Sequence, residues 1–198
     1  MKIPKLRDLG EAVKAIFSRP YPSRFPAEPL SPAEGFRGKP EFRSECIGCG
    51  ACAAVCPSAA IIQSDDRELK MRAFELKLDR CIFCGLCVES CPVKTGIVQT
   101  REFDLAVFDR DELVQKIERE LMLCEVCGEI ISTREHLRWV ADHLGGLAYA
   151  HPALMLAGLG ERGLTEREEF AVDQNDLTRA DRMAITCPRC RHLLSLKG

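Results

Sequence analysis

Apolar residues recur every three or four positions near the start of the chain, at Leu6, Leu9, Val13, Ile16 and Phe17. This spacing places them on one face of a helix, so we predict an amphipathic helix within residues 1–19. Basic residues outnumber acidic ones in the same segment. The helix therefore has two interpretations: it packs on the chain's own core, or it lies on a partner protein or an anionic membrane surface.

The helical pattern stops at six prolines between residues 20 and 40. Because proline lacks an amide hydrogen and fixes φ, this stretch is predicted to be an extended arm. Phe25, Phe36 and Phe42 are its candidate anchoring side chains. Residues 1–40 are thus predicted to form a helix and an arm that runs over its own domain or over a neighbour.

Residues 41–105 contain an internal repeat. CIGCGACAAVCP at 46–57 matches CIFCGLCVESCP at 81–92 in every cysteine, and the similarity continues into IIQS at 61–64 and IVQT at 97–100. Between the runs, residues 75–79 alternate polar and apolar side chains, as a half-buried strand does. We predict an α+β core of two equivalent halves, each with a short strand, a cysteine loop, a short helix and a second short strand.

Helical spacing returns after the repeat. Asp109 followed by Glu112 resembles a capping box, and Leu113, Ile117 and Leu121 form one stripe. Residues 109–123 are therefore predicted to be a helix, within a connecting segment at 106–123.

Residues 124–198 are predicted to form a further, helical domain. Ser132 opens a helix that Gly145 ends, and Thr165 opens another, because each opening residue has a glutamate three positions later. The longest uncharged run, 144–160, contains four glycines and a proline. A turn and a buried helix are expected there, and no membrane-spanning helix is predicted in the chain.

The most informative feature of the composition is cysteine, of which the chain has 12 in 198 residues. Charges interrupt the N-terminus, which lacks the apolar segment of a signal peptide, so we expect the chain to lie in a reducing compartment. Every cysteine lies three or four positions from another, which favours metal binding over disulfides. The net charge of −2 argues against a nucleic-acid-binding protein.

Each run in the repeat has the form C-x2-C-x2-C-x3-C-P, which is typical of bacterial two-cluster ferredoxins. Small residues such as Gly50 and Gly85 suit a chain wrapped tightly around a cluster. We predict two 4Fe-4S clusters, with structural zinc as the rival interpretation. The resemblance to these ferredoxins implies that the fourth cysteine of each run binds the other cluster. The implied ligands are Cys46, Cys49, Cys52 and Cys91 for one cluster, and Cys81, Cys84, Cys87 and Cys56 for the second.

Two further C-x2-C pairs bracket the C-terminal segment, Cys124 with Cys127 and Cys187 with Cys190. Four thiolates from two such pairs are the usual ligands of a tetrahedral structural Zn²⁺. The insert of about sixty residues exceeds the usual fifteen to twenty or so, as an insertion at the tip of a zinc-ribbon-like domain would. Zn²⁺ is the predicted ion, and a single rubredoxin-like iron is the alternative.

No catalytic set is visible in the sequence. Because it has no Ser/His/Asp arrangement, phosphate loop or nucleotide fingerprint, we expect no nicotinamide or flavin on this chain. His136 and His143 are expected to be packed or solvated side chains. The chain is therefore predicted to carry electrons without performing bond chemistry.

The paired cysteine runs, FRGKPE at 36–41, EFDLAV at 102–107 and the C-terminal cysteine pairs resemble one known group. This group is the electron-transfer subunit of formate hydrogenlyase-type, membrane-bound group 4 NiFe hydrogenases, which is related to the ferredoxin-type subunit of complex I. The resemblance implies a peripheral subunit on the cytoplasmic side of a membrane. Its implied partners are an upstream iron–sulfur donor, membrane-arm subunits, and the small and large hydrogenase subunits, of which the small subunit receives the electrons.

Two alternatives remain for the function: a soluble ferredoxin-like carrier, or the ferredoxin-type subunit of an NADH or ferredoxin:quinone oxidoreductase. The basic N-terminus and the long C-terminal segment disfavour the soluble carrier. The C-terminal cysteine pairs favour the hydrogenase branch, because complex I members usually lack them.

Overall fold

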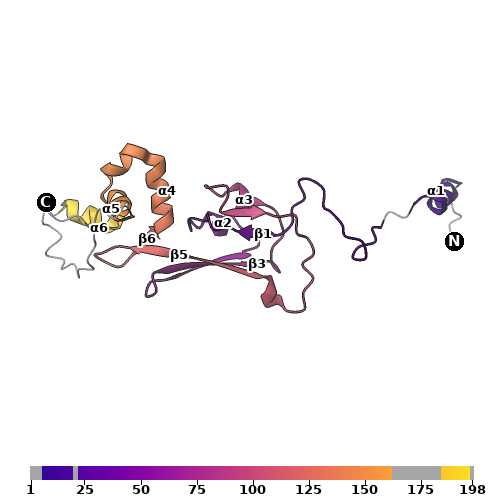
Figure 1. Cartoon of the computed structure of the whole chain (residues 1–198), viewed down its shortest axis with the longest axis horizontal. Helices are drawn as coiled ribbons and strands as arrows, with labels where there is room; N and C mark the ends of the chain where they lie inside the picture. The colour runs from indigo at the N-terminus through magenta and orange to yellow at the C-terminus, as the bar shows by residue number, and fades with distance from the viewer. Residues whose placement is uncertain (1–5, 20–21, 162–183, 197–198) are drawn as a thin grey trace. The chain divides into compact units, whose positions relative to one another are not determined.

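The computed structural model describes residues 6–19, 22–161 and 184–196 (Figure 1). The chain divides into two compact units, Met1–Phe36 and Arg37–Gly198. In the first unit, α1 spans Leu6–Phe17 and irregular chain without a further helix or strand follows among the described residues. The helix predicted within residues 1–19 is thus present, and the arm that should run over a surface stays a prediction. The apolar side chains of α1 are exposed, with Leu9 at 63 % and Phe17 at 86 %.

The second unit begins with the two halves that the cysteine repeat predicts. The first half holds β1 (Pro40–Phe42), α2 (Ala51–Ala54) and β2 (Ile61–Asp66), and the second holds β3 (Met71–Lys77), α3 (Leu86–Glu89) and β4 (Ile97–Gln99). This order confirms the prediction of strand, cysteine loop, helix and strand in each half. β1 pairs with β4, and β2 pairs with β3, both antiparallel. The first strand of each half therefore pairs with the second strand of the other half.

Alternate residues of β3 face the core between the halves. Phe74 and Leu76 are each 1 % exposed, and Leu78, just beyond the strand, is 6 % exposed. Burying a side chain of this size stabilises the fold by roughly 1.5–3 kcal/mol. Cys52 and Cys91 belong to the same buried cluster, so the core that holds the halves together also borders the cysteine loops.

The helix predicted over residues 109–123 is wrong. Asp109 precedes a single 3-10 turn, η1 (Arg110–Leu113), and the chain then continues as a strand, β5 (Val114–Leu123). The Asp109 carboxylate does cap this turn, because it accepts a hydrogen bond of 3.0 Å from the backbone N–H of Asp111. The capping signal was therefore real, but it starts one turn rather than a helix.

The apolar stripe of this segment fits both structures. Leu113, Ile117 and Leu121 are four positions apart, and an even spacing lies on one face of a strand as well as near one face of a helix. The antiparallel pairing of β5 with β3 over seven residues decides in favour of the strand.

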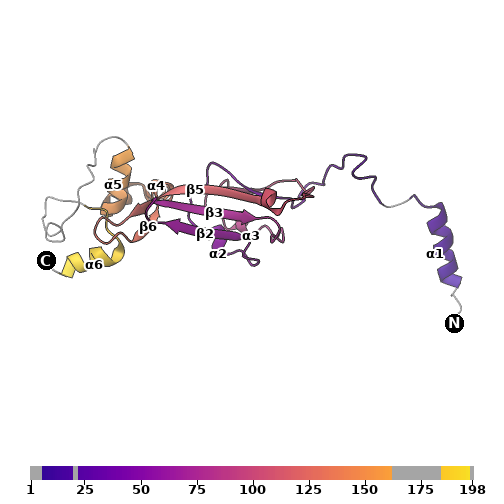
Figure 2. The ribbon, with the colours of Figure 1, turned by 90° about the horizontal axis from the view of Figure 1, so that it is seen from below.

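β5 joins the cysteine repeat to the C-terminal part of the chain. It pairs with β3 on one side and with β6 (Ile130–Thr133) on the other. The result is a four-stranded antiparallel sheet in the order β2-β3-β5-β6 (Figure 2). The hairpin of β5 and β6 therefore extends the inner hairpin of the repeat.

The helices that follow β6 are α4 (Arg134–Leu144), the 3-10 helix η2 (Gly145–Ala150), α5 (Pro152–Glu161) and α6 (Pro188–Leu196). Thr133, not Ser132, caps α4, because its Oγ1 accepts a hydrogen bond of 3.3 Å from the N–H of His136. Gly145 ends α4 with a φ of 54°, as predicted.

The uncharged run at 144–160 folds as predicted, into a turn and a helix whose Leu154 is 7 % exposed. The helix expected from Thr165 falls outside the described residues. Among the residues that the structure describes, no helix has both the length and the apolar character to cross a membrane.

Candidate metal and cluster centres

The two cysteine loops have the same backbone turn at equivalent positions. Gly50 precedes α2 with a φ of 83°, and Gly85 precedes α3 with a φ of 82°. Side chains with a Cβ rarely adopt this left-handed conformation, so glycine allows the turn in both loops. At Gly50 a Cβ would also lie 2.5 Å from Oε1 of Gln63. The repeat in sequence is therefore a repeat in backbone geometry.

The first cavity in the repeat collects one predicted ligand set. Its four cysteines are Cys46, Cys49, Cys52 and Cys91. The cavity is small, about 20 Å³, and its other walls are apolar, with Phe42 and Phe74 among them. Gly96 also borders it, and a Cβ there would lie 3.3 Å from the sulfur of Cys91. Three thiols of one loop thus meet a fourth thiol from the other half.

The second cavity collects the other predicted set. Its four cysteines are Cys56, Cys81, Cys84 and Cys87. It is also about 20 Å³, and Leu76, Ile61 and Phe83 form part of its wall. Cys56 thus lines a cavity with the cysteines of the second loop, and Cys91 lines one with the cysteines of the first.

Burial makes two of these thiols, Cys52 and Cys87, hard to ionise without a cation. It raises the pKa of Cys52 to about 12 and that of Cys87 to about 11. Thiolate is the form that binds metal, and a bound metal replaces the proton. Soft sulfur ligands inside an apolar wall fit an iron–sulfur cluster, whose iron ions would supply the positive charge.

Three side chains that sequence reasoning did not single out contact the first cysteine loop. Arg119 of β5 donates hydrogen bonds to the carbonyl oxygens of Cys46 at 2.5 Å and Ser44 at 2.7 Å. Thr133 and Arg72 bond the next two carbonyls of the loop. The signal for Arg119 was present in the alternation of side chains along 114–123, which becomes visible once that segment is a strand.

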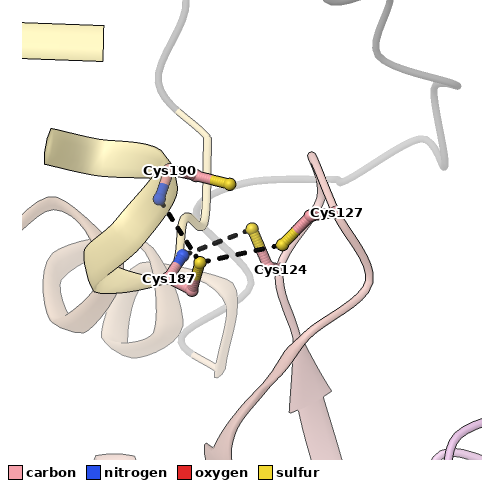
Figure 3. Close-up of side chains that lie close together, drawn as sticks. All are labelled: Cys124, Cys127, Cys187 and Cys190. Atoms are coloured by element: carbon pink, nitrogen blue, oxygen red, sulfur yellow. Dashed lines mark hydrogen bonds between the residues drawn. The ribbon is translucent and has the colours of Figure 1, made fainter. Parts of the chain in front are cut away.

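The C-terminal cysteine pairs also come together. The thiol sulfurs of Cys124, Cys127, Cys187 and Cys190 all lie within 4.8 Å of one another (Figure 3). The first pair lies in the loop between β5 and β6, and the second pair lies at the start of α6. The sulfurs of Cys127 and Cys187 are 3.7 Å apart. One tetrahedral ion fits a group of four sulfurs this close.

Backbone N–H groups help to hold negative charge at this site. The N–H of Cys187 donates to the sulfur of Cys124 at 3.3 Å, and the N–H of Cys190 donates to the sulfur of Cys187 at 3.4 Å (Figure 3). Burial raises the pKa of Cys124, but hydrogen bonds from N–H groups outweigh burial and lower this pKa to about 7. Burial raises the pKa of Cys190. A cation is therefore needed for all four groups to be thiolates at neutral pH.

The two histidines on α4 have other contacts. The Nδ1 of His136 lies 2.7 Å from the hydroxyl of Ser132, and the His143 ring lies 3.9 Å from the ring of Trp139. Neither belongs to the metal-ligating group found among the described residues. These contacts agree with the expectation that both are packed or solvated side chains.

Two cysteine-lined cavities in a duplicated α+β core define a class, the 4Fe-4S ferredoxin-type proteins. The family described as "4Fe-4S dicluster domain" matches residues 45–95. Formate hydrogenlyase subunit 6 of Escherichia coli is 32 % identical over 90 % of this chain and 85 % of its own length. NADH-quinone oxidoreductase subunit I 2 of Geobacter metallireducens is 35 % identical over 61 % of this chain and 98 % of its own length.

The chain therefore belongs to the family of iron–sulfur electron-transfer subunits that includes formate hydrogenlyase subunit 6 and NADH-quinone oxidoreductase subunit I. A solved structure, the archaeal membrane-bound sulfane sulfur reductase complex, contains a chain with 27 % sequence identity and a TM-score of 0.41. That likeness covers 57 % of this chain and 61 % of the other. The resemblance drawn from the sequence is confirmed by the family relationship, and the chain is an electron-transfer subunit of an oxidoreductase complex.

Proposed function

We propose that the chain relays electrons through two 4Fe-4S clusters inside a membrane-associated, hydrogenase-type complex. The observation that carries this proposal is the pair of cavities, each lined by four cysteines. The first cluster would be held by Cys46, Cys49, Cys52 and Cys91, and the second by Cys81, Cys84, Cys87 and Cys56. Such clusters supply one-electron transfer at potentials that hydrogen bonds, charge and burial adjust.

The residues around the cavities exclude water and fix the thiols. Phe42 and Phe74 stand with ring centroids 6.3 Å apart beside the first cavity. Leu76 and Phe83 line the second. Because Cys56 and Cys91 each reach the other half, the two centres are held in one rigid core. The chain would thus fix the positions of the two clusters and supply the apolar surroundings that affect their potentials.

At the C-terminal site, Cys124, Cys127, Cys187 and Cys190 would hold one Zn²⁺ with a structural role. The support is four cysteine sulfurs within 4.8 Å and no carboxylate or histidine in the group. A single rubredoxin-like iron is the alternative, because it accepts the same four thiolates.

The proposed direction of transfer is from an upstream iron–sulfur donor to the small hydrogenase-like subunit, on the cytoplasmic side of the membrane. The likeness to formate hydrogenlyase subunit 6 extends over 90 % of this chain, whereas that to the Geobacter relative covers 61 %. This difference favours the hydrogenase branch over the NADH or ferredoxin:quinone branch. A soluble carrier is the remaining alternative.

Metal analysis of the full-length protein, prepared without oxygen, tests the cofactors. We expect about eight irons, about eight acid-labile sulfides and roughly one zinc per chain. Cys91→Ser and Cys56→Ser should each disturb a different cluster signal in the EPR spectrum of the reduced protein. Zinc without acid-labile sulfide would refute the cluster proposal.

Purification of the native protein tests the complex. We expect it to elute with a large oxidoreductase assembly that contains hydrogenase-like subunits. Elution of a cluster-loaded monomer would instead favour the soluble carrier.

A further inference from the structure

The first cysteine loop is held by hydrogen bonds from the C-terminal part of the sheet. Arg119 on β5 donates from Nε to the carbonyl of Cys46 at 2.5 Å and from Nη2 to the carbonyl of Ser44 at 2.7 Å. On β6, the hydroxyl of Thr133 donates to the carbonyl of Ile47 at 2.5 Å. Successive carbonyls of the loop thus point toward donors on the β5–β6 hairpin rather than toward water.

The equivalent loop of the second half lacks this cover. Ile82 is 61 % exposed, whereas its counterpart Ile47 is 7 % exposed. A side-chain hydrogen bond does reach the second loop, from Nη1 of Arg37 to the carbonyl of Cys84 at 2.8 Å, and Arg37 is not part of the hairpin. The β5–β6 hairpin therefore breaks the symmetry of the two cysteine loops.

The two arginines at the first loop differ in whether a carboxylate neutralises their positive charge. Arg72 donates to the carbonyl of Gly48 at 3.1 Å, but its Nε also pairs with the carboxylate of Asp65 at 2.6 Å. All three side-chain nitrogens of Arg119 donate to carbonyl oxygens. In its described hydrogen bonds, Arg119 contacts carbonyl oxygens and no carboxylate, so its positive charge is not neutralised by an ion pair there.

The acidic residues next to Arg119 in the sequence do not face the first cysteine loop. Side chains alternate along a strand, so Glu118 and Glu120 lie on the opposite face of β5 from Arg119. The Glu120 carboxylate pairs with Arg134 at 2.8 Å. The positive charge of Arg119 consequently acts on the Cys46 loop without a carboxylate on its own face of the strand within two residues.

We propose that Arg119 raises the reduction potential of the cluster held by Cys46, Cys49, Cys52 and Cys91. Reduction adds one negative charge, which a nearby guanidinium stabilises. Arg119 touches no ligand sulfur in the described contacts and acts as a positioning and electrostatic residue, in the way that outer contacts adjust metal sites. This inference rests on the proposed cluster ligands.

The test compares Arg119→Gln with Arg37→Gln in the full-length protein, prepared anaerobically. Each substitution removes one guanidinium that bonds one cysteine loop, so they are matched in charge. Redox titration followed by EPR should give two midpoint potentials in the wild type. We expect Arg119→Gln to lower one of them and leave the other unchanged, and Arg37→Gln to leave the first unchanged.

The outcomes separate this inference from the proposed function. Fewer than two clusters in the wild type, by iron and sulfide content, would refute the ligand assignment. Two clusters with both midpoints unmoved in Arg119→Gln, or the same midpoint moved equally by both variants, would refute the role of Arg119. If Arg119→Gln loses iron, Arg119→Lys retains the charge and should load both clusters with a smaller fall of the same midpoint. A raised midpoint in a fully loaded Arg119→Lys protein, or a shift of the other midpoint alone, would overturn the inference.

Discussion

Gly48 shows at the residue scale why the first cysteine loop depends on the strands behind it. Its φ is +67°, and a Cβ at this position would lie 2.8 Å from the Cγ2 of Thr133 and 3.1 Å from the Cβ of Arg119. Glycine is thus needed twice, for the backbone conformation and for the close approach of the β5–β6 hairpin.

We expect Gly48→Ala to destabilise the protein by more than the roughly 1–2 kcal/mol that left-handed backbone alone costs. The added methyl group would force Thr133 and Arg119 away from the loop. Gly128→Ala is the control, because Gly128 has a φ of +69° and open space around its Cβ position. Denaturant unfolding and iron content measure both variants, and equal losses would contradict the clash.

Asp65 and Arg72 form a shielded ion pair next to the same loop. Their side chains are 21 % and 11 % exposed, and two bonds of 2.6 and 2.9 Å join them. Hydrogen bonds from Arg72 lower the pKa of Asp65 below its ordinary value. The stabilisation is therefore complete above the unfolded-state pKa of about 3.9, and it is lost only as pH falls through the lower folded pKa.

Asp65→Asn is predicted to cost about 1–3 kcal/mol, because it leaves the Arg72 guanidinium without its charged acceptor. The loss should be equal at pH 6 and pH 8, since the carboxylate is ionised at both. Glu129→Gln, which breaks an exposed pair with Arg67, should cost at most about 1 kcal/mol. A loss for Asp65→Asn that grows between pH 6 and pH 8 would contradict this account.

At the scale of elements, the repeat could be predicted from the sequence, but the extension of its sheet by β5 and β6 could not. Cysteine spacing, Gly50 and Gly85 are local features, so the two loops and short helices could be predicted from them. β5 depends on a partner strand: its stripe of Leu113, Ile117 and Leu121 suits either period, and only pairing with β3 decides. The contacts of Arg119 were missed for the same reason, because they follow from that pairing.

The C-terminal cysteine site ties one end of the β5–β6 hairpin to α6. Cys124 and Cys127 lie in the hairpin loop, and the N–H of Cys124 donates to the carbonyl of Glu129 at 2.8 Å across it. Thr133 follows on β6 and bonds the carbonyl of Ile47. A bound ion would therefore steady the hairpin that holds the first cysteine loop.

If an ion binds at this site, we expect Cys127→Ser to abolish its binding and to increase hydrogen exchange in β6 and at residues 44–48, because the hairpin loop loses its tie to α6. Residues 81–85 should exchange as before, because the side-chain hydrogen bond that reaches this loop comes from Arg37, which lies outside the hairpin. Arg189→Ala is the control, since Arg189 is an exposed residue between two of the cysteines. Unchanged exchange at 44–48 in a metal-depleted variant would show that the two sites are independent.

At the scale of the whole molecule, α1 carries an apolar face that its own unit leaves exposed. Ile16 is 76 % exposed and Phe17 is 86 % exposed, while Lys14 pairs with Glu11 on the helix surface. Burying such side chains is favourable, so a partner subunit or a lipid surface is the expected environment of this face.

Ile16→Glu should therefore lower the fraction of the protein that sediments with membranes or with its complex, because it places a charge on the apolar face. Glu11→Gln, on the polar surface of the same helix, should leave that fraction unchanged. Iron content should be normal in both variants, since α1 belongs to a different unit from the cysteines. Equal sedimentation of wild type and Ile16→Glu would exclude this face as the attachment site.

The crossing of Cys56 and Cys91 between the two cavities also bears on how the protein matures. Neither half can complete a four-sulfur set from its own chain segment. A cluster in the first cavity would fix Cys91, which belongs to the second half, and so would order the chain segment that forms the second cavity. We therefore expect insertion of one cluster to favour insertion of the other. Under iron limitation, cells would then contain chains with two clusters and chains with none, and few chains with a single cluster.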